Sequence, residues 1–164
     1  MNITLIGMPG CGKSTTGISL SKALKMNFVD VDKVIIQRTG KTLAQILDAV
    51  GDDGFRQVEN DVNASLDLKN SVIAPGGSVI YGEEAMAHLR EISKVVYLQV
   101  RQEELERRLG DLHARGVTIK PGQTFTDLYN ERCPLYRKYA HVTIDTDHKT
   151  MFEVVMAIRK ALQI

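Results

Sequence analysis

Residues 7–15 read GMPGCGKST, in which Gly7, Gly12, Lys13 and Ser14 match the pattern G-x-x-x-x-G-K-[ST]. The pattern follows a short apolar run and precedes a helical pattern, the context that a phosphate-binding loop requires. The glycines let backbone N–H groups turn around phosphate oxygens, and the following helix presents its positive dipole end. In such loops the lysine bridges the β- and γ-phosphates and the serine hydroxyl ligates Mg²⁺. The flanks favour this interpretation over a glycine turn that matches by chance.

Cys11 lies inside this loop, near the expected helix N-terminus, where a thiol can become reactive. The alternative is a small residue that fills a tight loop. If the thiol is accessible, its alkylation is expected to block nucleotide binding. Cys133 is far from Cys11 in the sequence and the two have no metal-ligand spacing, so both are expected to be free thiols.

Two carboxylates follow the second apolar run, in the sequence FVDVD over residues 28–32. Asp30 and Asp32 would point the same way in an extended segment, and ligands collect at the carboxyl ends of parallel strands. One carboxylate could hold a Mg²⁺-bound water while the other accepts a proton from an attacking hydroxyl. The alternative is that they cap the helix expected over residues 33–38.

The segment DGFRQVEN, residues 53–60, places Arg56 and Glu59 three residues apart, which is close enough to pair on a helix. Taken alone, this spacing also fits an ordinary surface ion pair.

Gly76 and Gly77 follow the third apolar run in IAPGGSV, residues 73–79, and would let a ligand approach the backbone closely or form an ordinary turn. Further arginines occur in RRLGDLHARG, residues 107–116, and in RCPLY, residues 132–136. Each of them taken alone could be a solvated charge.

The elements that must position these residues alternate along the chain. Apolar or β-branched runs recur at residues 3–6, 28–31, 72–74, 95–100 and 142–144, and stretches with helical apolar spacing lie between them. This alternation predicts an α/β fold with a parallel sheet that helices cover on both faces. The length of 164 residues predicts one domain, residues 1–164.

Residues 110–126 differ from their surroundings because they hold three glycines and a proline among polar residues, between helical patterns over 101–109 and 127–140. Long excursions in compact domains are often lids, and the alternative is a passive surface loop.

Charge and hydropathy limit the classes of partner. The 21 basic and 20 acidic residues give a net charge of +1, so no basic field indicates nucleic acid or a membrane surface. No apolar run is long enough to span a bilayer, and no basic leader precedes the first apolar run. We therefore expect a cytoplasmic monomer that binds small molecules.

Taken together and in this order, these segments resemble the shikimate kinase family. The resemblance rests on GMPGCGKST, FVDVD, FRQVE, PGGSV, RRLGDLHARG and RCPLY, and it covers most of the chain. It implies a three-layer P-loop kinase fold with a central five-stranded parallel sheet, a substrate-binding helical region near residues 33–61 and a mobile lid near residues 110–124. It also implies Mg²⁺- and ATP-dependent phosphorylation of the shikimate 3-hydroxyl, which yields shikimate 3-phosphate and ADP in aromatic amino-acid biosynthesis.

The resemblance also assigns roles to residues at matching positions. The nucleotide would be bound by Gly10, Cys11, Gly12, Lys13, Ser14, Thr15, Arg107 and Arg115. Shikimate would be bound by Asp32, Arg56, Gly76, Gly77 and Arg132, with Glu59 orienting Arg56. Mg²⁺ would be held at Ser14 and Asp30, and the catalytic groups would be Lys13, Asp32 as base and Arg115 from the lid. Adenine would stack on Arg107 or Arg108.

Two segments depart from the family pattern. Pro75-Gly76-Gly77-Ser78 stands where the family usually has three glycines, and Arg115-Gly116 replaces an Arg-Pro pair in a lid that is also shorter. Two alternatives follow: a related kinase for another hydroxylated acid, such as a gluconate-like sugar acid, and a nucleotide-binding regulatory protein without efficient transfer. The paired aspartates argue against the regulatory protein, which needs no second carboxylate aimed at an acceptor.

Overall fold

The computed structural model describes residues 1–110 and 120–164. The strands are β1 (Ile3–Ile6), β2 (Asn27–Asp30), β3 (Ser71–Ala74), β4 (Lys94–Gln99) and β5 (Val142–Asp145). The helices are α1 (Lys13–Leu24), α2 (Val31–Thr39), α3 (Leu43–Ala64), α4 (Glu83–Ile92), α5 (Gln102–Leu109), α6 (Phe125–Tyr139) and α7 (Met151–Leu162), with a short 3₁₀ helix η1 (Gly77–Tyr81) after β3.

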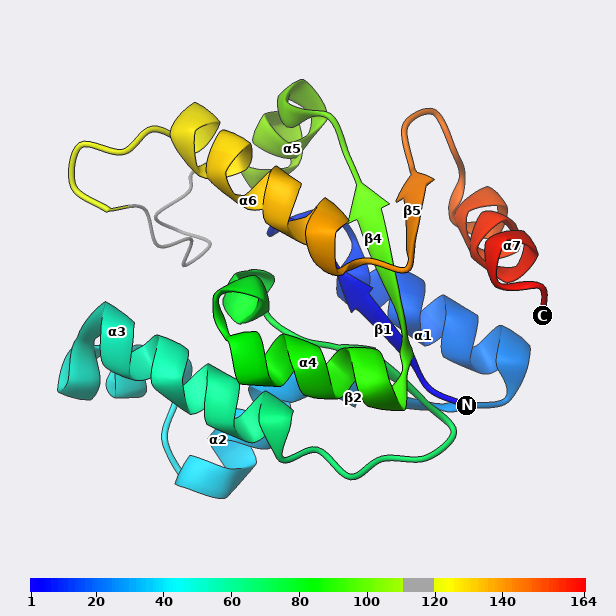
Figure 1. The fold of residues 1–164 in the computed structure, drawn as a ribbon. Helices are drawn as coiled ribbons and strands as arrows, with labels where there is room; N and C mark the ends of the chain where they lie inside the picture. The colour runs from blue at the N-terminus through cyan, green and yellow to red at the C-terminus, as the bar shows by residue number, and fades with distance from the viewer. Residues whose placement is uncertain (111–119) are drawn as a thin grey trace.

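The five strands form one parallel sheet in the order β2-β3-β1-β4-β5. In Figure 1, α1 and α7 lie together on one side of this sheet, and α3 and α4 pack against each other on the other side. The predicted α/β fold with a five-stranded parallel sheet is therefore confirmed, and helices form the outer layers.

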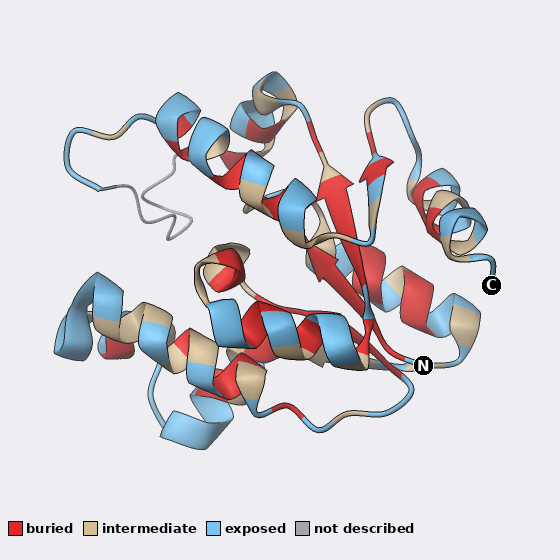
Figure 2. Ribbon diagram, viewed as in Figure 1, coloured by how far each residue is buried: buried red, intermediate tan, exposed pale blue. Residues whose placement is uncertain are grey.

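Burial follows the order of the strands. Every residue of β1 and β3 is buried, whereas the edge strands β2 and β5 are more exposed (Figure 2). A central parallel strand is covered on both faces, so most of its residues are apolar, and the buried Thr4 and Ser71 are the polar members of β1 and β3. The apolar runs in the sequence reflect this requirement.

The order of the strands places the site. The chain leaves β1 for β2 at one edge, returns to β3 and then crosses to β4 on the other side of β1. Ligands in open parallel sheets bind at the carboxyl ends of the strands, where this reversal leaves a crevice. The phosphate loop, the residues after β2 and the glycines after β3 all emerge at that edge.

One expected boundary is wrong. The run predicted as a strand over residues 28–31 is a strand over Asn27–Asp30, and α2 begins at Val31. Asp32 therefore lies in the first turn of a helix instead of an extended segment. The Asp30 side chain accepts a hydrogen bond from the Asp32 N–H at 3.0 Å, so Asp30 is the N-cap residue that the capping alternative foresaw.

Within the described part of the chain, no helix has both the length and the apolar character needed to cross a membrane. The expectations that residues 1–164 form one domain and that residues 110–124 form a mobile lid stay predictions.

A buried tyrosine joins α6 to the glycine segment. Tyr136 is fully buried, its ring stacks on Tyr97 with centroids 5.2 Å apart, and its hydroxyl donates to the Gly77 carbonyl at 2.6 Å. This hydrogen bond fixes the position of Gly77 relative to α6.

We expect Tyr136→Phe to lower the free energy of unfolding by about 1–2 kcal/mol, because it leaves the Gly77 carbonyl without a donor. Urea denaturation measures this change. Tyr139→Phe on the same helix is the control, because the Tyr139 hydroxyl makes no hydrogen bond within the described residues. Equal stability of the two variants would contradict the prediction.

Candidate active site

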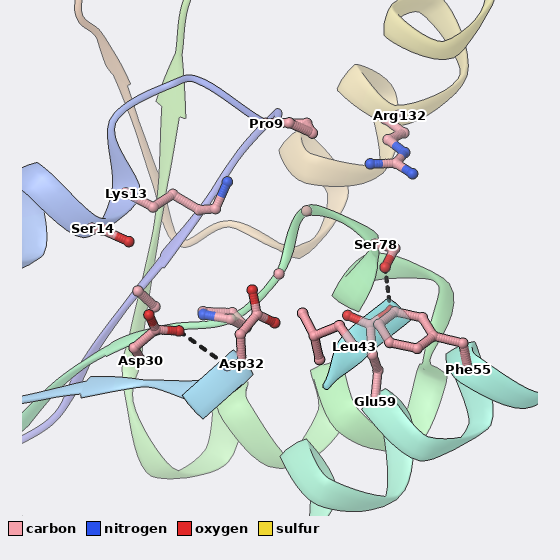
Figure 3. A pocket seen from close by; sticks show the side chains of 14 residues that line it. Pro9, Lys13, Ser14, Asp30, Asp32, Leu43, Phe55, Glu59, Ser78 and Arg132 are labelled. Atoms are coloured by element: carbon pink, nitrogen blue, oxygen red, sulfur yellow. Dashed lines mark hydrogen bonds between the residues drawn. The ribbon is translucent and has the colours of Figure 1, made fainter. Parts of the chain in front are cut away.

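A hollow at the carboxyl edge of the sheet has a volume of about 310 Å³. Figure 3 shows side chains from the phosphate loop, β2, α2, α3, η1 and α6 around it. Its lining residues are Pro9, Lys13, Ser14, Asp30, Asp32, Leu43, Phe55, Glu59, Ala74, Pro75, Gly76, Gly77, Ser78 and Arg132. This volume lies at the lower end of the range of about 300–1,000 Å³ that is typical of small-molecule sites.

The phosphate loop forms one wall of this cavity. Helix α1 begins at Lys13 with Gly12 as its N-cap, with no capping side chain and no acidic residue in its first turn. By contrast, α3, α6 and α7 each begin with a threonine capping box. The Lys13 Nζ donates to the carbonyls of Gly7 and Met8 at 2.9 and 3.1 Å. A positive helix end beside a lysine is a favourable place for an anion.

Cys11 is buried, with 4% of its surface exposed. A Cβ atom on Gly7 would lie 2.7 Å from the Cys11 Sγ, so the thiol fills the inside of the loop. This position favours the interpretation of Cys11 as a small filling residue. Its contact with a nucleotide stays a prediction.

Asp30 and Asp32 both line the cavity. They do so as the N-cap and a first-turn residue of α2, and not from the extended segment that was expected. Burial raises the pKa of Asp32, the neighbouring Asp30 raises it further and Lys13 opposes both effects. A carboxylate with a raised pKa accepts a proton more readily than an exposed one.

The predicted metal ligands, Ser14 and Asp30, lie at the same end of the cavity (Figure 3). In residues 1–110 and 120–164, no three His, Cys, Asp or Glu side chains gather as a metal cluster. Mg²⁺ in kinases needs no such cluster, because it is held by one or two protein groups, waters and the phosphates of the substrate. The hydroxyl and carboxylate oxygens present here fit Mg²⁺, and its binding stays a prediction.

Glu59 makes a different contact from the expected one. Its carboxylate accepts a hydrogen bond from the Ser78 hydroxyl, and it forms no ion pair with Arg56 among the described residues. The prediction that Glu59 pairs with Arg56 is therefore wrong in this structure. Sequence spacing along α3 allowed that pair, but the α3 face carrying Glu59 is directed toward η1.

Burial raises the pKa of Glu59 to about 7, against the opposing effect of the Ser78 hydrogen bond. The nearby Asp32 raises this pKa further, whereas Arg132 and Arg56 lower it. Ser78, which the sequence marked only as a departure from three glycines, is thus a contact of a buried acid in the cavity wall.

The two glycines of this wall have little space around them. A Cβ atom on Gly76 would lie 2.9 Å from the Glu59 Oε2, and one on Gly77 would lie 3.2 Å from the Arg132 Nη1. Any larger residue would push against charged groups that border the cavity. The neighbours of this backbone are therefore the Glu59 and Arg132 side chains, and the close approach of a ligand to Gly76 and Gly77 stays a prediction.

Arg132 lies at the opposite end of the cavity from Ser14 (Figure 3). It is 5% exposed, and its Nε has no hydrogen-bond partner among the described residues. Arg56 does not line the main cavity but borders an adjoining hollow together with Arg132, Ser78 and Lys120. The two predicted arginines therefore meet beside the cavity, although they come from α3 and α6.

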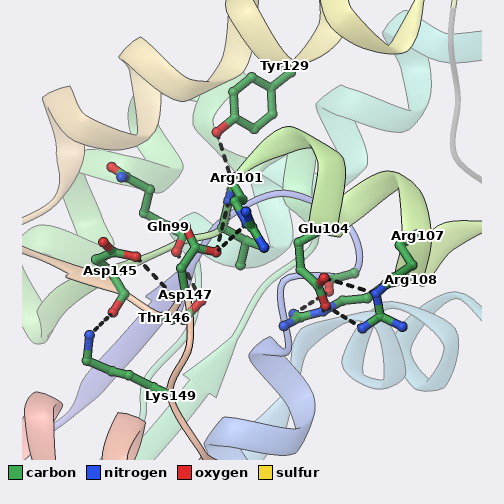
Figure 4. Close-up of polar contacts among 12 residues, drawn as sticks. Gln99, Arg101, Glu104, Arg107, Arg108, Tyr129, Asp145, Thr146, Asp147 and Lys149 are labelled. Atoms are coloured by element: carbon green, nitrogen blue, oxygen red, sulfur yellow. Dashed lines mark hydrogen bonds and ion pairs between the residues drawn. The ribbon is translucent and has the colours of Figure 1, made fainter.

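A second hollow, of about 240 Å³, lies beyond the phosphate loop and is lined by Arg101, Glu104, Arg108, Thr146, Asp147, His148 and Lys149. In Figure 4, Glu104 accepts hydrogen bonds from both Arg107 and Arg108. The Arg107 side chain is 73% exposed, whereas the Arg108 Nη1 reaches the Gly10 carbonyl at 3.2 Å.

Residues 146–149 were not predicted as part of a site. The signal for them is topological: they follow β5, whose carboxyl end lies at the same edge of the sheet as the phosphate loop. Thr15 lies exposed in the first turn of α1. Arg115 and most of the predicted lid lie outside the described residues.

A phosphate loop with Asp30 beside it at one end, Asp32 in the middle and a buried arginine at the other end are the features of a P-loop kinase that acts on a small anionic molecule. The sequence model of the shikimate kinase family matches residues 9–163. This match spans nearly the whole chain, so the chain belongs to the shikimate kinase family. It is an ATP-dependent small-molecule kinase.

Individual relatives agree with this assignment. The chain is 38% identical to a shikimate kinase of Methylococcus capsulatus over 99% of its own length and 92% of that protein. It is 36% identical to a shikimate kinase of Mycobacterium leprae over 97% of its length and 81% of that protein.

Solved structures give the same family. A shikimate kinase from Acinetobacter baumannii in complex with shikimate superposes with a TM-score of 0.87 at 33% identity, over 99% of this chain and 92% of that one. A shikimate kinase from Aquifex aeolicus gives a TM-score of 0.86 at 33% identity, over 99% and 96% of the two chains.

We expect the stability difference between the wild type and Glu59→Gln to depend on pH. A pKa raised from 4.5 to about 7 on folding favours the folded state fully below about pH 4.5, and this contribution is lost as the pH rises through 7. The free energy of unfolding of the wild type should therefore fall relative to the variant by at most about 3 kcal/mol across this interval.

Urea denaturation at a series of pH values measures this difference. The control is Glu91→Gln, at an exposed carboxylate on α4, which should follow the wild type at every pH. If Glu59→Gln also follows the wild type at every pH, the raised pKa of Glu59 is wrong.

Proposed function

We propose that this protein transfers the γ-phosphoryl group of Mg²⁺-ATP to the 3-hydroxyl of shikimate, giving shikimate 3-phosphate and ADP. The observation that carries this proposal is a single cavity with the phosphate loop at one end and the buried Arg132 at the other. Such a cavity suits a small molecule that presents a hydroxyl to ATP and a carboxylate to an arginine. The complex of the Acinetobacter baumannii relative with shikimate supports the choice of acceptor.

Arg132 is proposed to bind the carboxylate of the acceptor. A buried guanidinium without an acidic partner in the described part of the chain is costly unless an anion reaches it. A carboxylate matches its planar fork with two parallel hydrogen bonds, and Arg56 in the adjoining hollow can add a second cation. These contacts would orient the ring as well as attract it.

Asp32 is proposed to accept the proton of the attacking hydroxyl. It lies between the phosphate loop and Arg132 in the cavity (Figure 3), and burial and Asp30 raise its pKa. A hydroxyl held at this position would face both the carboxylate and the phosphate chain. The lone pair of the acceptor oxygen forms the new P–O bond as its proton passes to Asp32, and ADP leaves with the electrons of the broken bond.

Lys13 and the first-turn N–H groups of α1 are proposed to bind the phosphates, with Ser14 and Asp30 at the Mg²⁺ site. Bound Mg²⁺ would supply charge neutralisation on the phosphate oxygens. The hollow beside Arg108 and residues 146–149 is the proposed place for the nucleoside, because it adjoins the outer side of the loop at Gly10. Of the two arginines predicted to stack on adenine, Arg108 is the better candidate, because it lines this hollow whereas Arg107 is exposed and does not.

Arg115 from the lid remains the proposed group for stabilising the transferred phosphoryl charge. A monomeric state and a cytoplasmic location also remain proposals, based on the balanced charge and the small-molecule substrates.

The test of the function is coupled ADP release from purified protein with Mg²⁺-ATP and either no acceptor, shikimate, quinate or gluconate. We expect acceptor-dependent turnover with shikimate. Turnover only with gluconate or quinate would overturn the acceptor but keep the kinase. ATP binding without turnover on any acceptor would instead support a nucleotide-binding regulatory protein.

We expect Arg132→Lys to raise the KM for shikimate by about tenfold to a hundredfold and to change the KM for ATP little, because an ammonium cannot replace the guanidinium fork. Steady-state kinetics measures both constants. Arg137→Lys, at an exposed arginine on the same helix, is the matched control. An unchanged acceptor KM would remove Arg132 from the carboxylate site.

We expect Asp32→Asn to lower kcat by about 100- to 10,000-fold with the fold retained, because an amide cannot accept the proton. Turnover and circular dichroism measure activity and fold. Asp48→Asn, at an exposed aspartate of α3, should retain full activity. Near-normal turnover of Asp32→Asn would rule out Asp32 as the base.

A further inference from the structure

Tyr81, the last residue of η1, lies between the two arginines assigned to the acceptor carboxylate. The guanidinium carbon of Arg56 is 4.0 Å from the centre of the Tyr81 ring, and that of Arg132 is 5.5 Å from it. Both distances are within the range of about 6 Å at which an arginine is attracted to an aromatic ring. One ring therefore contacts cations from two helices that are far apart in the sequence.

The Tyr81 hydroxyl fixes the ring from its other end. It donates to the Glu131 Oε2 at 2.6 Å, and Glu131 directly precedes Arg132 on α6. The ring is thus attached to the same helix turn as one of the arginines. Burial raises the pKa of the Tyr81 hydroxyl and the hydrogen bond to Glu131 raises it further, whereas Arg132 opposes both effects; the net pKa is raised, so the ring remains neutral.

The contacts of Arg56 and Arg132 with an aromatic ring, rather than with an acid, affect how these arginines can bind an anion. Neither Arg56 nor Arg132 forms an ion pair with an acid of the described residues, and Glu59, the acid three residues from Arg56, is hydrogen-bonded to Ser78. An ionised acid on these arginines would compete with the carboxylate of a substrate. An aromatic face attracts a guanidinium without neutralising it and leaves its N–H groups free for a planar anion.

We propose that Tyr81 is a positioning residue for substrate binding: its ring holds Arg56 and Arg132 at the cavity with their charges available for the acceptor carboxylate. This proposal rests on the proposed function for its kinetic consequence, but the arrangement of the three side chains does not depend on which carboxylic acid is the acceptor.

The test compares Tyr81→Leu, which removes the ring, with Tyr81→Phe, which keeps the ring and removes the hydroxyl. We expect Tyr81→Leu to raise the acceptor KM by about five- to thirtyfold, the equivalent of about 1–2 kcal/mol, and to leave the KM for ATP within about twofold. Tyr81→Phe should restore an acceptor KM close to that of the wild type. A general loss of stability would not separate the two Michaelis constants in this way.

Phe152→Leu is the control for loss of an aromatic side chain, because Phe152 is 73% exposed on α7, away from the cavity lining. It should leave both constants unchanged. If Tyr81→Leu does not fold, Tyr81→Met removes the ring and keeps a side chain of similar length. An unchanged acceptor KM in a folded variant without the ring would overturn the proposal, and so would failure of Tyr81→Phe to restore it.

A second readout is independent of catalysis. Protons of the Arg56 side chain close to the ring face should show a ring-current shift in the NMR spectrum, with the signals assigned by their loss in Arg56→Lys. We expect this shift to disappear in Tyr81→Leu and to persist in Tyr81→Phe. If shikimate is not an acceptor but the shift behaves as expected, the proposed function fails and the role of the ring stands. A shift that persists without the ring would refute the contact itself.

Discussion

The site depends on a positive charge that the fold buries without an ion pair among the described residues. Arg132 is 5% exposed, and its Nε lacks a partner in the part of the chain that the structure describes. Burying an uncompensated guanidinium opposes folding, so the surrounding structure must keep it in place. Tyr136 of α6 contributes to this, because it stacks on Tyr97 of the sheet and donates a hydrogen bond to the Gly77 carbonyl, and the ring of Tyr81 in η1 lies close to the Arg132 guanidinium. In the proposed function, the same buried charge would attract the carboxylate of the acceptor.

The other groups of the cavity are arranged around this charge. Gly76 and Gly77 are small because Glu59 and Arg132 leave no space for a Cβ atom. The Ser78 hydroxyl donates a hydrogen bond to the Glu59 carboxylate, and Glu59 forms no ion pair with Arg56 or Arg132 among the described residues. The phosphate loop lies at the far end, so the proposed function separates the groups that would bind ATP from those that would bind the acceptor. In that proposal a hydroxyl held between them would lie near Asp32, and one arrangement of the cavity walls would provide both orientation and proton transfer.

Much of the fold followed from local patterns. The apolar runs predicted all five strands to within about a residue or two, because strands covered on both faces are made mostly of apolar residues. The phosphate loop was predictable because its chemistry needs glycines and a lysine at fixed spacing. The boundary after Asp30 was misjudged because Asp30 both ends a strand and caps a helix, and a sequence pattern does not separate these roles. The predicted pairing of Glu59 with Arg56 was wrong because spacing along one helix does not show which partners other elements bring close, and here Ser78 of η1 bonds to Glu59.

The sequence by itself determined the family, the phosphate loop and the residue types that chemistry on a small anionic molecule requires. Only the tertiary structure decided which of these residues meet, because Arg56, Tyr81 and Arg132 come from three separate elements that the sheet order brings together. It also decided that Arg108, and not Arg107, contacts the loop, and that residues 146–149 border the same edge. The physical reason is that spacing along the chain fixes neighbours within a helix or strand, whereas contacts between elements depend on packing and strand order.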